Sequence, residues 1–415
     1  MPSFSTPLSG MNANSLALQV IANNLANLNT VGYKGGRMTF RDLFYQQVGS
    51  TGSGNPVQVG VGSAVGAISS LVTQGSIEST GLATDVAIQG SGFFLLDRDG
   101  LRLYTRAGNF DLDANGSLVT SDGAKVLGFP ATNGVISTNQ ALSPLQINTG
   151  QISPPSATEN VQLRLNLDAN AAVGSTFSTA LSVFDSLGGR HVLNFNFTKA
   201  GSNTWDYTIT IPAVDVGKPA TDPPVEVASG TGLTFDGNGQ LTSPTADISG
   251  ITIDNFADGA NKLDFTWQLL DANGGSLLTQ VASPSATFTT QQDGFPAGTL
   301  LTFSIQSDGV IQGIYSNGQT LPLGQIALAT FPNVQGLLRD GSNNFLASLS
   351  SGLPNTGVPG TGGRGTVSGG ALELSNVDIA REFAQLILAQ RAFQANARTI
   401  TTFDEVTQET INLKR

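Results

Sequence analysis

The sequence predicts a mainly β protein with α-helical termini, in which the N- and C-terminal helices form a coiled-coil-like assembly domain. Apolar residues recur at helical spacing at both ends of the 415-residue chain, and Val377–Arg415 contains neither Gly nor Pro. The middle of the chain is instead rich in Gly and in apolar residues that alternate with polar ones, as strands do. The length exceeds that of one ordinary core, so we expect two or three domains.

Composition excludes several classes of function. The chain has 30 Asp and Glu against 19 Lys and Arg, and its net charge of -11 argues against nucleic acid or an anionic membrane as a partner. It has no Cys, so neither disulfides nor thiolate chemistry is available. The N-terminus lacks the pattern of a secretory signal peptide, and the apolar stretches fall far short of the ~20 residues that span a membrane. We expect a soluble chain without membrane insertion, exported by another route.

The first helix is expected from about Leu8 to Leu28, with Thr6 as its cap and Pro7 at the first helical position. Residues 1–33 contain no charged side chain, whereas a solvated helix normally carries charges on its outer face. We therefore expect this helix to be buried, with its amides hydrogen-bonded across subunits or to linker backbone. Its apolar ladder is Leu8, Met11, Leu18, Ala22 and Leu25, with Leu16, Ile21 and Leu28 beside it. The amides are those of Asn12, Asn14, Asn23, Asn24 and Asn27.

The last helix is expected to run to the end of the chain over roughly 35 residues. Ser375 and Asp378 resemble a capping box, with Asp in place of the usual Glu. The heptad-like repeat suggests coiled-coil packing, and apolar helices need a partner surface. That partner is either other copies of the chain or, in the alternative, the first helix of the same monomer. The apolar ladder is Ile379, Phe383, Leu386, Phe393, Ala397 and Ile400.

Two antiparallel β-sandwich or barrel-like domains are expected between the helices, the outer one inserted into the inner one. Turn-forming residues recur about every 8–12 residues from Ser69 onward, and Leu163 and Leu165 alternate with polar residues. Residues 46–67 and the Gly-rich residues 351–370 are expected to be linkers, the first with one edge strand. The expected boundaries are a terminal helical domain at 1–32 and 374–415, an extended linker or hairpin at 33–70, a split middle β domain at 71–158 and 292–368, and an outer inserted β domain at 159–291.

Several stretches carry a resemblance to a known family. Ala22–Lys34 resembles the N-terminal signature of the bacterial flagellar rod, hook and hook-associated axial proteins, and Leu374–Arg398 resembles their C-terminal signature. Gly90–Phe94 and Thr105–Phe110 are similar to the middle β domain of the family. The insert at about 160–290 favours a hook-type member, because rod-type members lack a large module there.

The resemblance implies a structural subunit of the flagellum, without catalysis or cofactor. It implies a curved tube of many copies that joins the rod to the filament and acts as a universal joint for motor torque. The implied partners are further copies, the distal rod, the hook cap, the hook–filament junction proteins and the type III export apparatus; the implied location is extracellular. The residues expected to serve subunit assembly are Leu8, Met11, Leu18, Ile21, Asn23, Asn24, Leu25, Asn27, Thr30, Gly32, Tyr33, Lys34, Ile379, Phe383, Leu386, Phe393, Ala397 and Ile400.

Two alternatives stay open at this point. One is a distal-rod subunit of the flagellar basal body with an unusual insert. The other belongs to a different class, a secreted β-domain protein that binds glycan or cells, with its terminal helices paired within the monomer. The first charges of the chain, Lys34, Arg37 and Arg41, form either a solvated face or a contact with acidic groups of a neighbouring subunit.

Three motifs imitate chemical sites. Asp111 to Asp122 has the spacing of a calcium loop, but its twelfth position is Asp and strands flank it, so a β-turn explains it equally well. Gly360 to Gly365 has a dinucleotide-binding spacing without the strand–turn–helix context that such a site needs. His191 is the single histidine, and we interpret it as an exposed residue of a surface turn. No metal or cofactor site is expected.

Overall fold

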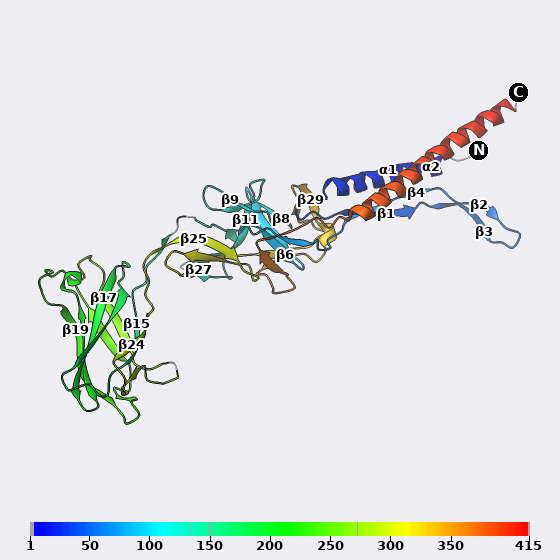
Figure 1. Ribbon diagram of the computed structural model, residues 1–415. Coiled ribbons are helices and arrows are strands. Elements are labelled where there is room, and N and C mark those ends of the chain that lie inside the picture. Colours follow the sequence, from blue (N-terminus) through cyan, green and yellow to red (C-terminus); the bar gives the residue numbers. More distant parts are fainter. Residues whose placement is uncertain (1–3, 133, 149, 151, 272, 414–415) are drawn as a thin grey trace. The chain divides into compact units, whose positions relative to one another are not determined.

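The computed structural model describes residues 4–413 except 133, 149, 151 and 272. The chain divides into two compact units (Figure 1). Unit 1 comprises Met1–Thr149, Thr302–Gly313 and Thr320–Arg415, and unit 2 comprises Gly150–Leu301 and Ile314–Gln319. The predicted fold class, mainly β with helical termini, is confirmed. No described helix combines the length and apolarity needed to cross a membrane.

The two terminal helices of unit 1, α1 (Ser5–Ala26) and α2 (Ile379–Asn412), lie side by side (Figure 1). Ala17, Ile21 and Ala389 form a small core between them, with Leu18 and Leu386 packed against it. The sequence left open whether these helices pack against other copies or against one another. They in fact cover one another in part, because small Ala side chains allow two helices to approach closely.

Both helices begin differently from the expectation. Helix α1 begins at Ser5 after Phe4, which makes no side-chain cap bond, so Thr6 is not the cap. Pro7 is accommodated in the first turn, where backbone N–H groups have no helical partner. Helix α2 is capped by Asp378, whose side chain accepts from the Arg381 N–H at 3.1 Å, and Ser375 is not the cap.

The segment after α1, where we expected an extended linker or hairpin at 33–70 with one edge strand within 46–67, forms two pairs of strands. Strand β1 (Gly36–Asp42) pairs with β4 (Ser63–Ser70), and β2 (Tyr45–Ser50) pairs with β3 (Pro56–Gly60), both antiparallel. The residues of β2 and β3 are exposed on both faces. Since neither face is buried, the sequence carries no one-sided apolar pattern by which these strands could be recognised.

The β part of unit 1 is built on one main sheet with the strand order β25-β26-β27-β11-β7-β8-β30-β29. One core includes Phe93, Tyr104, Leu127 and Phe345, which the alternation of apolar residues brings to one side. The elements are β5 (Ile77–Ser79), β6 (Val86–Gln89), β7 (Phe93–Arg98), β8 (Leu101–Thr105), β9 (Asp111–Leu112), β10 (Leu118–Val119), β11 (Lys125–Thr132), β12 (Val135–Ile136), β13 (Ser143–Pro144), β25 (Gly298–Ile305), β26 (Val310–Tyr315), β27 (Thr320–Ile326), β28 (Leu328–Thr330), η2 (Val334–Gly336), β29 (Leu338–Gly341), β30 (Asn344–Leu346), β31 (Asn355–Gly357), β32 (Thr366–Gly369) and β33 (Ala371–Glu373).

The Gly-rich residues 351–370, expected to be a linker, are part of this β structure. Strand β31 pairs with β28, and β32 pairs with β6. A Cβ atom added to Gly365 would lie 2.1 Å from the carbonyl oxygen of Gln89. The glycine there permits close backbone approach, so composition alone misled the prediction.

Unit 2 contains two sheets that share one core. The strand order is β21-β22-β15-β23, with β24 beside β15, in one sheet and β16-β17-β18-β19-β20 in the other. Trp205, Trp267 and Phe195 are fully buried in the common core. Strand β15 pairs parallel with β22 and β23, so this unit is not purely antiparallel as expected. The elements are β14 (Ile152–Ser153), β15 (Asn160–Asn166), β16 (Thr176–Phe184), β17 (Arg190–Gly201), β18 (Thr204–Ile211), η1 (Ala213–Val216), β19 (Val225–Phe235), β20 (Leu241–Ser243), β21 (Ile248–Ile253), β22 (Leu263–Gln268), β23 (Leu278–Thr279) and β24 (Ala286–Gln292).

Candidate assembly surface

The helix pair is fixed to the β part of unit 1 by a buried cluster of charges. The Lys34 Nζ donates to Glu373 Oε1 at 2.5 Å and to the Thr73 carbonyl at 2.9 Å. The Arg106 guanidinium donates to Glu373 Oε2 at 3.2 Å, and the side chains of Lys34 and Glu373 are fully buried. Lys34 therefore forms neither of the two contacts that the sequence left open, since it pairs with an acid of its own chain.

One carboxylate balances two cations in this cluster. Burial lowers the pKa of Lys34, while its hydrogen bond and charge pairing with Glu373 oppose that shift. Burial likewise lowers the pKa of Arg106, against the attraction of Glu373. A buried charge is tolerated only when it is paired, so the cluster requires Glu373, and Glu373 lies at the end of β33 just before α2.

The asparagines of α1 divide into two groups. Asn24 donates to the Gly36 carbonyl and accepts from the Gly36 N–H, both at 2.8 Å, which is the expected bond to linker backbone. Asn23 donates to the Tyr33 hydroxyl at 2.9 Å. Asn14 and Asn27 instead donate to carbonyls of their own helix. The side-chain amides of Asn23 and Asn24 thus hold the segment Tyr33–Gly36, which follows α1, against the helix.

Two further residues complete this junction and were missed by the sequence analysis. Asn376 accepts from the Gly35 N–H at 2.9 Å and donates to the Leu71 carbonyl at 2.7 Å. Arg339 donates to the Lys34 carbonyl at 2.6 Å, and its guanidinium lies 5.4 Å from the centre of the Tyr33 ring. Asn376 lies inside the C-terminal signature, so the sequence could have indicated its role. No motif or periodic pattern marks Arg339.

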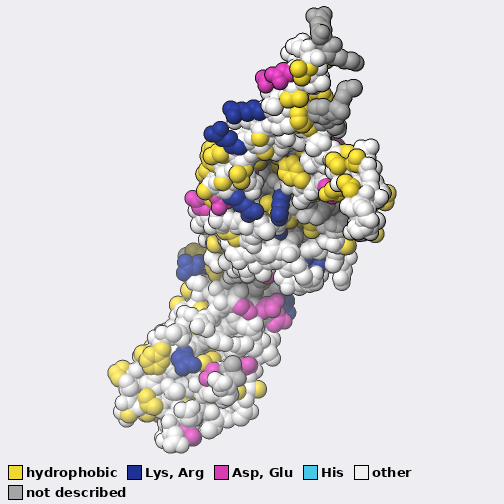
Figure 2. All heavy atoms as spheres, turned by 90° about the vertical axis from the view of Figure 1, so that its right-hand side faces the viewer, with side chains coloured by type: hydrophobic (Ala, Val, Ile, Leu, Met, Phe, Trp, Pro, Cys, Tyr) yellow, Lys and Arg dark blue, Asp and Glu magenta, His cyan; other side chains and the backbone are white. Residues whose placement is uncertain are grey.

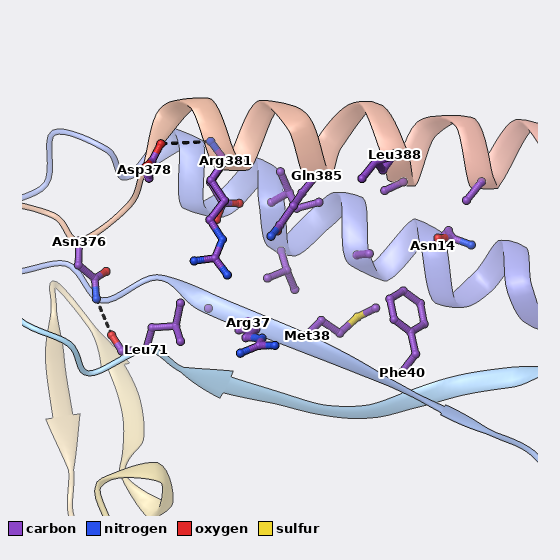
Figure 3. Close-up of a pocket in the computed structure, with 17 residues that line it drawn as sticks. Asn14, Arg37, Met38, Phe40, Leu71, Asn376, Asp378, Arg381, Gln385 and Leu388 are labelled. Atoms are coloured by element: carbon purple, nitrogen blue, oxygen red, sulfur yellow. Dashed lines mark hydrogen bonds between the residues drawn. The ribbon is translucent and has the colours of Figure 1, made fainter.

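A groove of about 420 Å³ lies between α1, α2 and β1 (Figure 3). Ile21, Met38 and Leu388 are among its apolar lining residues, and the charged Arg37 and Arg381 line it as well. Glu382 also lines it, and its Oε2 is buried without a hydrogen-bond partner. The groove combines apolar surface with a carboxylate oxygen that is free to accept a hydrogen bond.

Apolar side chains remain exposed around the groove and along the hairpins. Leu388 is 69% exposed. Figure 2 shows hydrophobic side chains gathered over this part of unit 1, with a few Lys and Arg side chains among them. The larger exposed apolar residues of the helices and hairpins are Phe4, Leu8, Leu16, Phe40, Phe44, Tyr45, Val48, Val57, Val59, Ile68, Ile379, Phe383, Ile387, Leu388, Val406, Ile411 and Leu413. We call this set, with the groove, the helix–hairpin surface.

The residues expected to serve assembly fall into three classes of exposure, and their role in assembly stays a prediction. The exposed ones are Leu8, Asn23, Ile379 and Phe383. The half-buried ones are Met11, Leu18, Leu25, Asn27, Thr30, Leu386, Phe393, Ala397 and Ile400. The buried ones are Ile21, Asn24, Gly32, Tyr33 and Lys34, and all of these contact their own chain.

The motifs that imitate chemical sites have structural explanations. Asp113 accepts from the N–H groups of Asn115 and Ser117, which lowers its pKa and forms a closed turn. Asp122 accepts from Asn344 at 2.8 Å. The glycines 360–365 lead into β32 rather than a helix.

The interpretation of His191 as an exposed turn residue is wrong. Its side chain is 7% exposed, and its ring centre lies 4.5 Å from that of Phe256. His191 is in phase with Leu193 and Phe195 along β17, and both of those side chains point into the core. The period of two was therefore a sufficient signal for its burial.

Four family models match the chain. They are the flagellar basal body protein FlaE D2 domain at residues 156–295, the flagellar hook protein FlgE/F/G D1 domain at 87–165, the flagellar basal body rod FlgEFG protein C-terminal region at 368–413, and the flagella basal body rod protein model at 4–34. Together they include the terminal helices, part of unit 1 and nearly all of unit 2.

Curated relatives match over the whole length. The flagellar hook protein FlgE of Treponema pallidum is 36% identical, with 100% of both chains covered. The flagellar hook protein FlgE of Escherichia coli is 36% identical, with 99% of this chain and 100% of that protein covered. The crystal structure of Helicobacter pylori flagellar hook protein FlgE2 has a similar fold, with a TM-score of 0.50, 17% identity and coverage of 70% of this chain and 98% of that chain. The chain belongs to the flagellar hook protein family.

Proposed function

We propose that this protein is a structural subunit of the bacterial flagellar hook, and that its copies assemble through the helix–hairpin surface. The observation that carries the proposal is the apolar exposure that remains after α1 and α2 have paired within one chain. Leu388 and Phe383 project from a helix whose other face is already packed. A monomer gains nothing from such side chains in water.

Burial of the exposed apolar side chains between subunits supplies enough free energy for the copies to associate. Full burial of one Leu or Phe side chain contributes about 1.5–3 kcal/mol. Several partly exposed residues of this kind on each subunit supply several kcal/mol per neighbour, before the cost of association is subtracted. The absence of charge in residues 1–33 removes the main cost of burying that face of α1.

The finer features of the function rest on the resemblance to the family. We propose that the assembly is a curved tube acting as a universal joint between rod and filament, with the terminal helices inside and unit 2 as an inserted domain. Its further partners are the distal rod, the hook cap, the hook–filament junction proteins and the type III export apparatus. Full-length similarity to hook proteins does not favour a distal-rod subunit or a secreted adhesion protein.

Sedimentation velocity of the full chain tests the proposal. The wild type is expected to form large species above a threshold concentration. Leu388→Ser removes an exposed apolar group of the helix–hairpin surface and is expected to raise that threshold severalfold. Leu349→Ser is the matched control, because Leu349 is fully exposed but lies outside the helices and hairpins. A wild type that stays monomeric at every concentration, or equal thresholds for the two variants, contradicts the proposal.

A further inference from the structure

Three acidic side chains surround the single histidine of the chain in unit 2. Asp185 and His191 flank the turn between β16 and β17, Asp215 lies on η1, and Asp258 lies between β21 and β22. His191 Nε2 lies 2.8 Å from Asp185 Oδ2, and His191 Nδ1 lies 3.3 Å from Asp215 Oδ2. One ligand atom from each of Asp185, His191 and Asp258 lies within 4.8 Å of the other two. Three segments of the chain, the β16–β17 hairpin, η1 and the β21–β22 loop, thus bring three carboxylates to one imidazole.

Neither Lys nor Arg balances the charges of this cluster among the described residues. The Asp185 side chain is fully buried, and the Asp215 side chain is 27% exposed. Among the ion pairs of the described residues, none brings a Lys or Arg to Asp185, Asp215 or Asp258. Asp185 Oδ1 accepts from the N–H groups of Leu187 and Gly189, but carboxylates held this close to one another still repel unless a cation or a proton is shared between them. A divalent cation would supply the missing positive charge.

Each ring nitrogen of the imidazole faces a carboxylate. Nδ1 is buried and makes no hydrogen bond, although Asp215 Oδ2 is 3.3 Å away. Nε2, on the opposite side of the ring, faces Asp185. A histidine that binds a metal commonly directs its second ring nitrogen at a carboxylate, which fixes the tautomer and the orientation of the ring. Asp215 is the carboxylate on that side of the ring, within ion-pair distance of Nδ1 but without a hydrogen bond to it.

Gly189 keeps space between the two carboxylates on the Nε2 side. A Cβ atom added there would lie 2.5 Å from Asp185 Oδ2 and 2.9 Å from Asp258 Oδ2. Gly189 does not have a positive φ, so backbone conformation does not explain a glycine at this position. Any side chain would occupy the space to which the two acidic groups and the histidine converge.

We propose that Asp185, His191 and Asp258 bind a divalent transition-metal cation of the Zn²⁺ class, with Asp215 as the residue that positions His191. One imidazole nitrogen and two carboxylates, with a further position left for water, form a ligand set that suits Zn²⁺ and its neighbours. Ca²⁺ and Mg²⁺ prefer oxygen ligands only. His191 binds as the neutral imidazole, and the proton shared by Nε2 and Asp185 leaves to solvent. The metal ties the β16–β17 turn to the β21–β22 loop, and it has no part in catalysis.

The single histidine allows an unambiguous test on the full chain. Wild-type protein, freed of metal by a chelator and held dilute at about pH 7, is titrated with ZnCl₂. Binding is followed by calorimetry and by the NMR signals of the His191 ring. We expect saturable binding of one Zn²⁺ per chain, with a shift of the ring signals at the same stoichiometry. CaCl₂ is expected to leave those signals unchanged.

Four variants locate the site. Asp258→Asn removes an exposed ligand with little risk to folding, and His191→Gln removes the nitrogen ligand. Gly189→Ala leaves all the ligands present and fills the space between them. Each of the three is expected to weaken Zn²⁺ binding about tenfold or more. Asp236→Asn is the control, because Asp236 closes a similar turn of unit 2 without a histidine, and it should bind like the wild type.

Several outcomes would overturn the proposal. One is that the ring signals of His191 do not respond to millimolar ZnCl₂. Another is that Asp258→Asn binds Zn²⁺ with the same affinity as the wild type. Binding that survives in His191→Gln would mean surface ions only. Loss of resistance of unit 2 to protease identifies any variant that fails to fold. If the other variants fail to fold, the Zn²⁺ affinity of Asp258→Asn alone tests the proposal, because Asp258 is exposed.

Discussion

Lys34 and Glu373 form a fully buried ion pair with 2.5 Å between Nζ and Oε1, although 339 positions separate them in the sequence. Lys34 follows the C-terminal end of α1, and Glu373 precedes the N-terminal end of α2. The ion pair therefore joins the chain segments next to these two helix ends inside unit 1. The helix–hairpin surface is held in place by this junction. The junction therefore determines how the apolar face is presented.

Replacement of Glu373 by Gln is expected to destabilise unit 1 strongly. The change leaves Lys34 and Arg106 as two buried cations without their acid, and breaking a buried pair of this kind costs about 3–5 kcal/mol. The measurement is the free energy of unfolding in urea. Glu78→Gln on the neighbouring strand β5 is the control, since Glu78 is exposed and should change stability by less than about 0.5 kcal/mol. Equal stability of the two variants would show that the buried pair is not the junction.

Replacement of Gly32 by Ala is expected to cost more than the same change at Gly54. Both glycines have a positive φ, of 69° and 84°, which costs an alanine about 1–2 kcal/mol. Only at Gly32 would the new Cβ also collide with backbone, 2.6 Å from the Ala107 nitrogen. Urea unfolding of the two variants separates the collision from the conformational cost. Similar losses would mean that the segment after α1 is not packed tightly against Arg106 and Ala107 at this point.

Replacement of Gly10 by Leu is expected to loosen the pairing of α1 with α2. A Cβ atom at Gly10 would lie 2.9 Å from Nδ2 of Asn396 on α2, so a larger side chain must displace the Asn396 amide from its bond to the Ala392 carbonyl. The termini should become more sensitive to protease in dilute solution, and Asn396→Ala in the same chain should restore resistance in part. Asn12→Leu adds the same side chain at an exposed position and serves as the control. Equal sensitivity of the Gly10 and Asn12 variants would contradict the pairing of the helices.

Unit 2 is expected to lose stability in acid through Asp185. Burial alone would raise the pKa of Asp185, but the hydrogen bond with His191, the interaction with Asp258 and the N–H groups of Gly189 and Leu187 lower it below its ordinary value of 3.8. A carboxyl whose pKa is lower in the folded state stabilises that state above pH 3.8, and the contribution disappears as the pH falls through the folded pKa.

The measurement is the unfolding of unit 2 in the presence of a chelator, from about pH 5 to pH 2. Asp185→Asn should flatten this dependence, whereas Asp254→Asn, at an exposed position of the same unit, should retain it. A wild-type profile that Asp185→Asn leaves unchanged would show that this carboxyl is not linked to folding.

The sequence predicted those parts of the fold in which one face of an element is buried. The helices α1 and α2 were predicted from apolar spacing, and β15 from the alternation of Leu163 and Leu165. A linker or hairpin was expected at 33–70, but the strands β2 and β3 could not be located within it, because their residues are exposed on both faces and show no one-sided apolar pattern. The strand β32 was missed because Gly365 before it and Gly369 within it serve close backbone approach, which composition does not distinguish from flexibility.

The site was predictable only in part, for a similar reason. The exposed positions of the apolar ladders follow from helical periodicity. The contact between Lys34 and Glu373 depends on the tertiary path of the chain, and no local pattern encodes it. The burial of His191 was available from its phase along β17, but the acids that surround it come from η1 and from the β21–β22 loop.

Electron microscopy of the purified full-length protein tests the central claim most directly. Above the threshold concentration the wild type should form curved tubes of uniform diameter, and Leu388→Ser at the same concentration should form few or none. A wild type that forms no tubes, or a Leu388→Ser variant that forms them equally well, would contradict assembly through the helix–hairpin surface.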